Sequence, residues 1–192
     1  MTDPDLPALE TRDGLPDALR ILIKDYPRDA WEVDPNFSQL IRFWLDRHLM
    51  FRRLLKTLQD DSEATLDAGM DPVQFASRLS RLGSNFLQNL HGHHQIEDTH
   101  YFPRLKQLET RLERGFEILD RDHHAIDGHL SIFADEANDV LKSIENPKAP
   151  MAEIETLRRG IKRMETFLDR HLSDEEDLIV PVLLRHAPEG LT

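Results

Sequence analysis

The sequence predicts an all-α fold, an up-down-up-down four-helix bundle with a short N-terminal capping helix. Four stretches carry apolar residues at every third or fourth position, the spacing of one face of an α-helix. The 192 residues contain no stretch of alternating β-branched residues, which would be typical of strands. The connectors between the four stretches are short to moderate, so neighbouring helices should run antiparallel.

The four expected helices have recognisable starts and stops. The first runs from residue 36 to about residue 60, with Asp34 and Pro35 as its N-cap and first-turn residues. The second follows a connector at residues 69–72 and continues to Pro103, which should kink or end it because proline lacks the backbone N–H. The third runs from about residue 110 to 144, and after a loop at residues 146–150 the fourth carries residues 154–178.

The chain before the first helix is interpreted as a cap. Its first dozen residues are acidic and contain prolines, so we expect a disordered or loosely docked tail. A short helix could then start at Gly14 and end before Pro27. We therefore divide the chain into an N-terminal tail with a short helix, residues 1–34, and one four-helix bundle domain, residues 35–187.

Composition excludes several classes of function. The formal charge of −12 repels phosphate backbones and anionic lipids, so we expect neither nucleic acid nor membrane as a partner. The absence of cysteine excludes disulfides, thiolate zinc sites and cysteine-ligated iron-sulfur clusters. The N-terminus lacks the basic and apolar regions of a signal peptide, and a cytoplasmic location is expected. A protein partner cannot be named from the sequence.

A repeated motif carries the main functional signal. His93 and Glu97 in the second helix have the same spacing as His171 and Glu175 in the fourth, and a proline follows each histidine after ten residues. Four residues span about 6 Å along a helix and return to nearly the same azimuth. Each histidine and its glutamate therefore share one helix face.

Two more histidines, one in each remaining helix, continue the apolar stripes. Burying two glutamates without partners would cost several kcal/mol. No lysine or arginine lies on these stripes in obvious register to pair with them. A metal cation is then the simplest counter-charge. The candidate metal ligands are His48, His93, Glu97, His123, His171 and Glu175.

Imidazole and carboxylate ligands suit iron, manganese, zinc and cobalt. Two histidines and one glutamate in each half resemble the 2-His-1-carboxylate arrangement of non-heme iron, so we expect two iron ions with an oxo or hydroxo bridge, while other divalent metals remain alternatives. No organic cofactor motif and no catalytic residue are identified. No Ser/His/Asp arrangement or glycine-rich phosphate loop supports a hydrolase or a kinase.

The remaining polar residues near the motifs receive other interpretations. His94 and His124 adjoin better-placed histidines and should project about 100° away from them, toward the surface or into an orienting role. Asp98 and Glu176 are expected to orient ligands or to be partly exposed. His100 could be an orienting or entrance residue, Asp127 could repeat the His/carboxylate pairing after His123, and His91, His129 and His186 are expected to be solvated or capping residues.

Taken together, these residues resemble the hemerythrin-like, or HHE cation-binding, family. The resemblance spans residues 35–186 and rests on a histidine in the first and third helices and a His-x-x-x-Glu pair in the second and fourth. It implies a four-helix bundle around a non-heme di-iron site, with bridging glutamates and terminal histidines. It also implies a small ligand at an open iron position, namely oxygen, nitric oxide or peroxide, for sensing, storage or stress response.

The family resemblance does not decide the physiological task. Oxygen-carrying members have a His-x-x-x-His pair in the third helix and a His-x-x-x-x-Asp pair in the fourth, whereas this chain has His124 and His129 five apart and Glu176 after His171. It is more similar to di-iron repair proteins and to oxygen- or iron-sensing domains. Whether it is an enzyme stays open. The alternative is a metal-free or pH-responsive helical interaction module, and a ferritin-like oxidase has only one of the two Glu-x-x-His motifs it needs.

Overall fold

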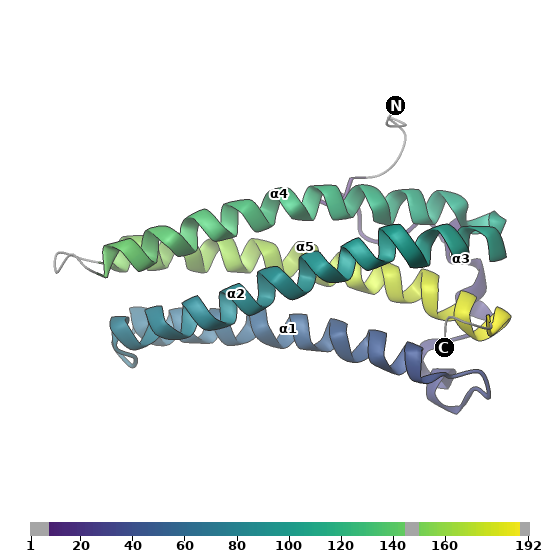
Figure 1. Cartoon of the computed structure of the whole chain (residues 1–192), viewed down its shortest axis with the longest axis horizontal. Helices are drawn as coiled ribbons and strands as arrows, with labels where there is room; N and C mark the ends of the chain where they lie inside the picture. Colours follow the sequence, from purple (N-terminus) through teal and green to yellow (C-terminus); the bar gives the residue numbers. More distant parts are fainter. Residues whose placement is uncertain (1–7, 145–149, 189–192) are drawn as a thin grey trace. The chain divides into compact units, whose positions relative to one another are not determined.

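A computed structural model describes residues 8–144 and 150–188 of the chain (Figure 1). Within these ranges the regular structure is entirely helical, which confirms the predicted all-α fold. None of the helices in the described part is long and apolar enough to cross a membrane. The long helices are α1 Gln39–Leu66, α2 Pro72–Ile96, α4 Glu113–Ser143 and α5 Met151–His186. Between α2 and α4 lie the π-helical turn η4 Glu97–Tyr101, the short helix α3 Phe102–Leu108 and the 3₁₀ turn η5 Thr110–Leu112. Three further 3₁₀ turns precede α1: η1 Asp17–Leu19, η2 Ile21–Lys24 and η3 Arg28–Val33.

The chain forms two compact units, and each takes in a segment of all four long helices. Of the described residues, the first unit contains 8–49, 94–124 and 169–188, and the second contains 50–93, 125–144 and 150–168. The predicted boundary between residues 34 and 35 falls inside the first unit and stays a prediction.

Contacts inside the second unit establish the helix directions. Between α1 and α2, Asp61 pairs with Arg78 and Phe51 packs edge-on against Phe86, so the numbers fall along one helix as they rise along the other. The same antiparallel order relates α2 to α4 and α4 to α5. These contacts confirm the up-down-up-down order of the bundle.

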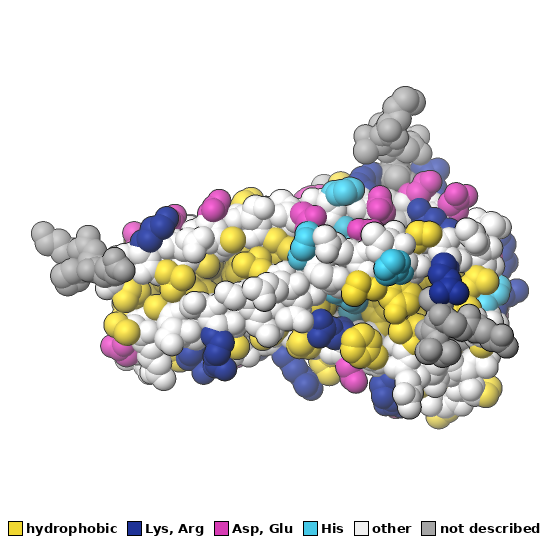
Figure 2. Space-filling view, viewed as in Figure 1, with side chains coloured by type: hydrophobic (Ala, Val, Ile, Leu, Met, Phe, Trp, Pro, Cys, Tyr) yellow, Lys and Arg dark blue, Asp and Glu magenta, His cyan; other side chains and the backbone are white. Residues whose placement is uncertain are grey.

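An open groove between α2 and α4 also belongs to the second unit. Its lining combines the apolar residues Leu87, Leu130 and Ala134 with four polar residues, and hydrophobic side chains are visible between these helices in Figure 2. His91 and Asp127 face each other across it at 3.5 Å.

In the first unit, the C-terminal part of α5 is buried on all sides. Every residue from position 174 to 184 is buried, although a bundle helix normally exposes one face. The outer face is covered by the N-terminal segment, purple in Figure 1. Four apolar side chains of that segment enter the core of the first unit: Leu15, Leu19, Leu22 and Trp31.

The N-terminal segment differs from its prediction. In place of the predicted short helix the structure has the separate 3₁₀ turns η1 and η2, and a third turn, η3, follows Pro27. Residues 1–7 lie outside the described part, but the expectation of a loose tail is wrong for the residues that follow. Leu9 and Arg12 are buried, and Arg12 pairs with two carboxylates.

Two boundaries of α1 also differ from prediction. Asp34 accepts the N–H of Asn36 and closes a turn, while Ser38 stands before the helix and its hydroxyl accepts the N–H of Ile41 at 3.4 Å. At the other end the helix continues past residue 60 to Leu66. The polar run there is compatible with helix because the hydroxyl of Ser62 donates to a carbonyl one turn earlier. The predicted loop at residues 146–150 falls almost entirely outside the described residues.

The region before α4 provides a prediction on stability. Arg111 donates two hydrogen bonds to the buried carboxylate of Glu109, and His186 and Arg185 lie 3.4 and 3.7 Å from it. The hydrogen bonds from Arg111 are the main cause that lowers the pKa of Glu109 to about 2. A lowered carboxyl pKa stabilises the fold above the unfolded-state pKa, and that stabilisation is lost as the pH falls through the folded-state value.

We therefore expect Glu109→Gln to lower the free energy of unfolding at pH 7 by about 1 kcal/mol, a value reduced because Arg111 is half-exposed. The difference from wild type should narrow as the pH falls from 4.5 toward 2. Urea unfolding at a series of pH values measures it, and a difference that stays constant over this range would contradict the assignment.

Candidate metal centre

Glu175 lies at the middle of the candidate site. Its side chain is fully buried, and its Oε1 accepts a 2.8 Å hydrogen bond from the indole N–H of Trp44. Its Oε2 lies 3.5 Å from the Nε2 of His48 and 3.5 Å from the Nε2 of His171. Two rings from different helices thus present the same nitrogen to one carboxylate oxygen.

A carboxylate holds the opposite nitrogen of each of three predicted ligand histidines. The distances from Nδ1 are 3.0 Å for His48 to Glu176, 2.7 Å for His123 to Asp98 and 3.4 Å for His171 to Asp122. A carboxylate accepts hydrogen bonds, so Nδ1 carries the proton and Nε2 keeps its lone pair. Metal-binding histidines commonly have this arrangement, because the carboxylate fixes both tautomer and ring orientation.

The Nε2 atoms of these rings face the inner carboxylates. The Nε2 of His123 lies 3.6 Å from the Oε2 of Glu97, too far for a hydrogen bond. The Nε2 atoms of His123 and His171 and the Oε2 of Glu175 are buried and accept or donate no hydrogen bond within the described structure. Buried polar atoms are normally satisfied, so their convergence fits a bound cation.

His94 lies in the candidate site, although the sequence analysis expected it at the surface or in an orienting role. Its ring is buried and stacks on that of His123, with centroids 4.0 Å apart and planes 7° from parallel. It also meets the His171 ring edge-on at 5.4 Å. One nitrogen from each of His94, His123 and His171 lies within 4.8 Å of the others, a group that could hold a metal ion.

The sequence did contain a signal for His94. The apolar stripe of α2 runs through Phe86 and Leu90, and His94 is the next residue at a spacing of four. His93 follows Leu90 at a spacing of three, so both histidines lie within the width of one buried stripe. The choice of only one of the two was the error.

The other predicted ligands have different placements. His48, Glu97 and Glu175 come together in the first unit, with donor atoms within 4.8 Å of one another. His93 is half-buried and is the last residue of the α2 segment in the second unit, where its ring packs on Phe51 at 5.3 Å. Its role as a ligand stays a prediction.

His123 is buried whereas His124 is exposed, as the stripe argument favoured. His100 is also exposed. Asp127 is half-exposed and lies beside His91, and His129 packs on Phe167. Asp98 and Glu176 contact the Nδ1 atoms of His123 and His48, a placement that agrees with the orienting role expected of them.

Electrostatics in the site favour a cation. Burial raises the pKa of Glu97 and the pKa of Glu175 well above the ordinary value. The neighbouring carboxylate of Glu97 raises the pKa of Glu175 further. Burial lowers the pKa of His171 to about 3, so this ring is neutral at pH 7 and able to ligate. Neutral imidazoles around acidic groups form a donor set that a metal ion completes.

Nearby arginines do not supply the missing charge. Arg12, Arg20 and Arg28, spaced eight residues apart, pair with the outer carboxylates Asp122, Asp174, Glu176 and Asp177. In the described structure neither an arginine nor a lysine pairs with Glu175, whose partners include Trp44, two histidines and the carboxyl group of Glu97. The inner carboxylate is therefore left for another cation.

A π-helical turn shapes the α2 side of the site. The N–H of Phe102 donates to the carbonyl of Glu97, a spacing of five residues rather than four. Pro103 explains the change, since its ring would clash with the carbonyl four residues before it in a regular α-helix. The predicted kink thus occurs as a widened turn, which begins at Glu97 and brings both Glu97 and Asp98 to ring nitrogens of His123.

A small, mostly apolar pocket adjoins these groups. Trp44, His48 and Glu175 line it together with side chains such as Ile41 and Val180, and its volume is about 10 Å³. That volume holds about one molecule of the size of water. A diatomic molecule is of this size class, whereas an organic substrate is far too large.

One comparison with known proteins gave a match. A family model described as the hemerythrin HHE cation-binding domain matches residues 39–189, which is most of the chain. No curated protein and no solved structure matches this chain. The match begins where α1 begins, so the N-terminal segment that covers α5 lies outside it.

The geometry predicts one tautomer for three histidines of the metal-free protein. His48, His123 and His171 should carry the proton on Nδ1 and none on Nε2, because each Nδ1 faces a carboxylate. Long-range proton–nitrogen NMR spectra of ¹⁵N-histidine protein distinguish the two nitrogens, and exposed His124 is the reference ring. Protonated Nε2 atoms on these three rings would contradict the geometry.

Proposed function

Since the chain belongs to the hemerythrin HHE cation-binding domain family, we propose that it binds two non-heme iron ions and a small ligand such as oxygen, nitric oxide or peroxide. The proposal rests chiefly on one observation: three buried histidines each have Nδ1 on a carboxylate and Nε2 turned inward. Structural histidines do not need such an arrangement.

The donor groups support two ions rather than one. His94, His123 and His171 would hold one ion, while His48 would hold the other. The His-x-x-x-Glu repeat adds His93, one helical turn before Glu97, to this second set. Glu97 and Glu175 offer carboxylates to both groups, since Glu175 Oε2 is equally far from His48 and His171.

Iron suits these donors better than softer or harder metals. The set is nitrogen and oxygen only, which excludes metals that prefer thiolates, and its imidazole content disfavours calcium and magnesium. Two such ions would supply open coordination positions and one-electron redox chemistry. The protein contributes fixed ring orientations, carboxylates that neutralise charge, and a dry interior.

A small ligand is supported by the size of the adjoining pocket. Its walls come from α1 and α5, and Trp44 keeps its N–H on Glu175 rather than pointing it into the opening. The protein would act in sensing, storage or stress response. Turnover as an enzyme would additionally require a path for electrons.

The alternative function is a metal-free, pH-responsive helical module. It requires buried histidines that change charge near neutral pH. Burial lowers the pKa of His171 to about 3, so this ring stays neutral over the physiological range. That observation favours the metal-binding function.

Metal content after anaerobic reconstitution with Fe²⁺ tests the proposal. Wild type should hold about two iron ions per chain, and His94→Ala should bind iron more weakly, by about 10-fold or more, because a ligand is lost. His124→Ala is the matched control, a neighbouring histidine on an exposed face of α4, and should keep both ions. Wild type without bound transition metal would refute the function, and full iron content in His94→Ala would remove His94 from the ligand set.

A further inference from the structure

We propose that the N-terminal segment, residues 8–38, is a positioning part of the metal centre, in which Arg12 and Arg28 hold the carboxylates that orient His171 and His48. This inference rests on the proposed metal-binding function. It concerns a segment that lies before the region matched by the family model. All the residues involved belong to the first unit.

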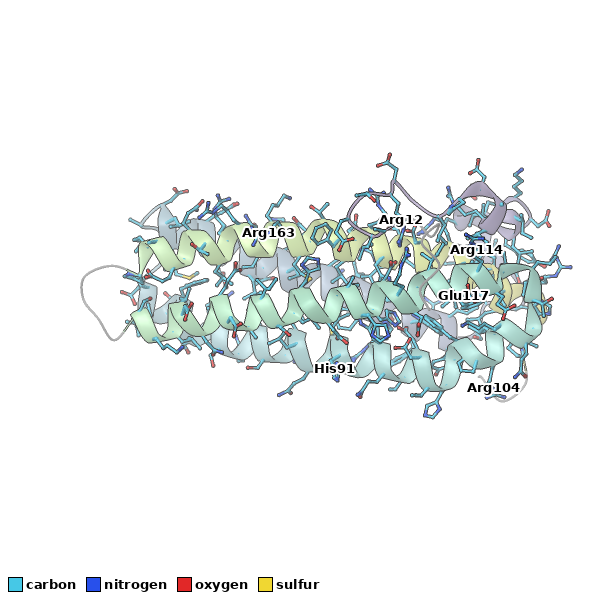
Figure 3. The ribbon with its side chains drawn as sticks, turned by 90° about the horizontal axis from the view of Figure 1, so that it is seen from above. Arg12, His91, Arg104, Arg114, Glu117 and Arg163 are labelled. Carbon is cyan, nitrogen blue, oxygen red and sulfur yellow. The ribbon has the colours of Figure 1, made fainter. Side chains whose placement is uncertain are left out.

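Two series of contacts, here called relays, each lead from an arginine through a carboxylate to a histidine. The first relay starts at Arg12. Its guanidinium is buried and donates through both Nη1 and Nη2 to the two oxygens of Asp122, with an Nη1 distance of 2.8 Å. Asp122 in turn faces Nδ1 of His171. Arg12 also donates through Nε to Asp174 on α5 at 2.8 Å, so one side chain links α4 and α5 where the N-terminal segment crosses them (Figure 3).

The second relay starts at Arg28. Its Nη1 donates to Oε2 of Glu176 at 2.6 Å, and the other oxygen of Glu176 lies 3.0 Å from Nδ1 of His48. The same guanidinium donates to Asp177 and to the carbonyl of Ser173. Two arginines from one segment thus reach two ligand histidines through one carboxylate each.

The backbone of the segment is also fixed against α5. Gly14 has a φ of +153°, a conformation that side-chain-bearing residues rarely adopt, and the next N–H, of Leu15, donates to Asp174 at 3.0 Å. Arg170 on α5 donates to the carbonyl of Arg12. These contacts place Arg12 independently of its own ion pairs.

The chemistry of the relays explains why they would affect a metal ion. A guanidinium binds a carboxylate through two parallel hydrogen bonds, which restricts its rotation. The carboxylate then holds the imidazole with Nε2 inward, so less freedom is lost when an ion binds. Because coupling between two binding events is reciprocal, a bound ion should also strengthen docking of the segment.

Arg20 offers a matched control from the same segment. It pairs with Asp177 on α5 at 2.8 Å and is about as exposed as Arg28, with 38% against 44% of the side chain accessible. Asp177 contacts arginines but no histidine in the described structure. Arg20→Met therefore removes an ion pair between the same two elements without interrupting a relay.

The experiment compares Co²⁺ affinity in full-length Arg12→Met, Arg28→Met and Arg20→Met by competition with a chromophoric chelator. We expect the first two to bind Co²⁺ up to about 10-fold more weakly than wild type, because 10-fold is the lower end of the range for direct partners of metal ligands and the arginines act one residue further out, and we expect Arg20→Met to match wild type. The visible d–d bands of bound Co²⁺ should shift in the two relay variants, and Arg28→Lys should recover part of the loss. Arg12 is buried, whereas Arg28 is half-exposed and its replacement should be tolerated. If Arg12→Met does not fold, Arg28→Met alone therefore tests the inference.

A second readout follows the reciprocal effect. Amide hydrogen exchange of residues 8–38 in wild type should slow when Co²⁺ is added, and this slowing should be smaller in Arg28→Met. If Arg12→Met and Arg28→Met have the same Co²⁺ affinity and the same spectra as Arg20→Met, the inference is overturned, but the proposed metal binding is not. A wild-type protein that binds no Co²⁺ or Fe²⁺ would overturn both.

Discussion

Full burial of Glu175 beside the Nε2 atoms of two histidines is the constraint on which the site depends. A carboxylate without solvent or a paired arginine is costly in a protein interior, and the pKa of Glu175 rises accordingly. The surrounding rings cannot relieve this cost as hydrogen-bond donors, because their Nδ1 protons are directed to other carboxylates. Among its described partners only Trp44 donates a hydrogen bond that does not depend on a carboxyl proton. The raised pKa means that a proton neutralises this group in the metal-free protein, and a bound metal ion would take the place of that proton.

The rest of the first unit is arranged around this inner group. Two of the outer carboxylates, Asp122 and Glu176, face the Nδ1 atoms of His171 and His48 and are themselves paired with arginines of the N-terminal segment. That segment covers the outer face of α5, which is why acidic residues such as Asp174 and Glu176 can be buried there at all. The site thus has a layered order, from inner carboxylates through histidines and outer carboxylates to arginines. The family match covers the first three layers but not the arginines.

Periodicity was sufficient to predict the helices, their antiparallel order and the burial of His48, His123 and His171, because each continues an apolar stripe. It failed for His94, since a stripe wide enough for a bundle core admits two adjacent residues. It also missed Arg12 and Arg28, whose partners are more than 100 residues away, at Asp122 and Glu176. Local sequence carries no signal for such pairs. The length of α1 was underestimated because buried hydroxyls can bond to their own helix.

Anomalous X-ray diffraction at the iron edge, from crystals of the iron-loaded protein, tests the central claim most directly. The account predicts two strong peaks in the interior of each chain, each within coordination distance of inward-facing Nε2 atoms, with His171 at one and His48 at the other. Iron only at surface histidines such as His100 or His124, or no iron peak in crystals grown with excess Fe²⁺, would contradict it.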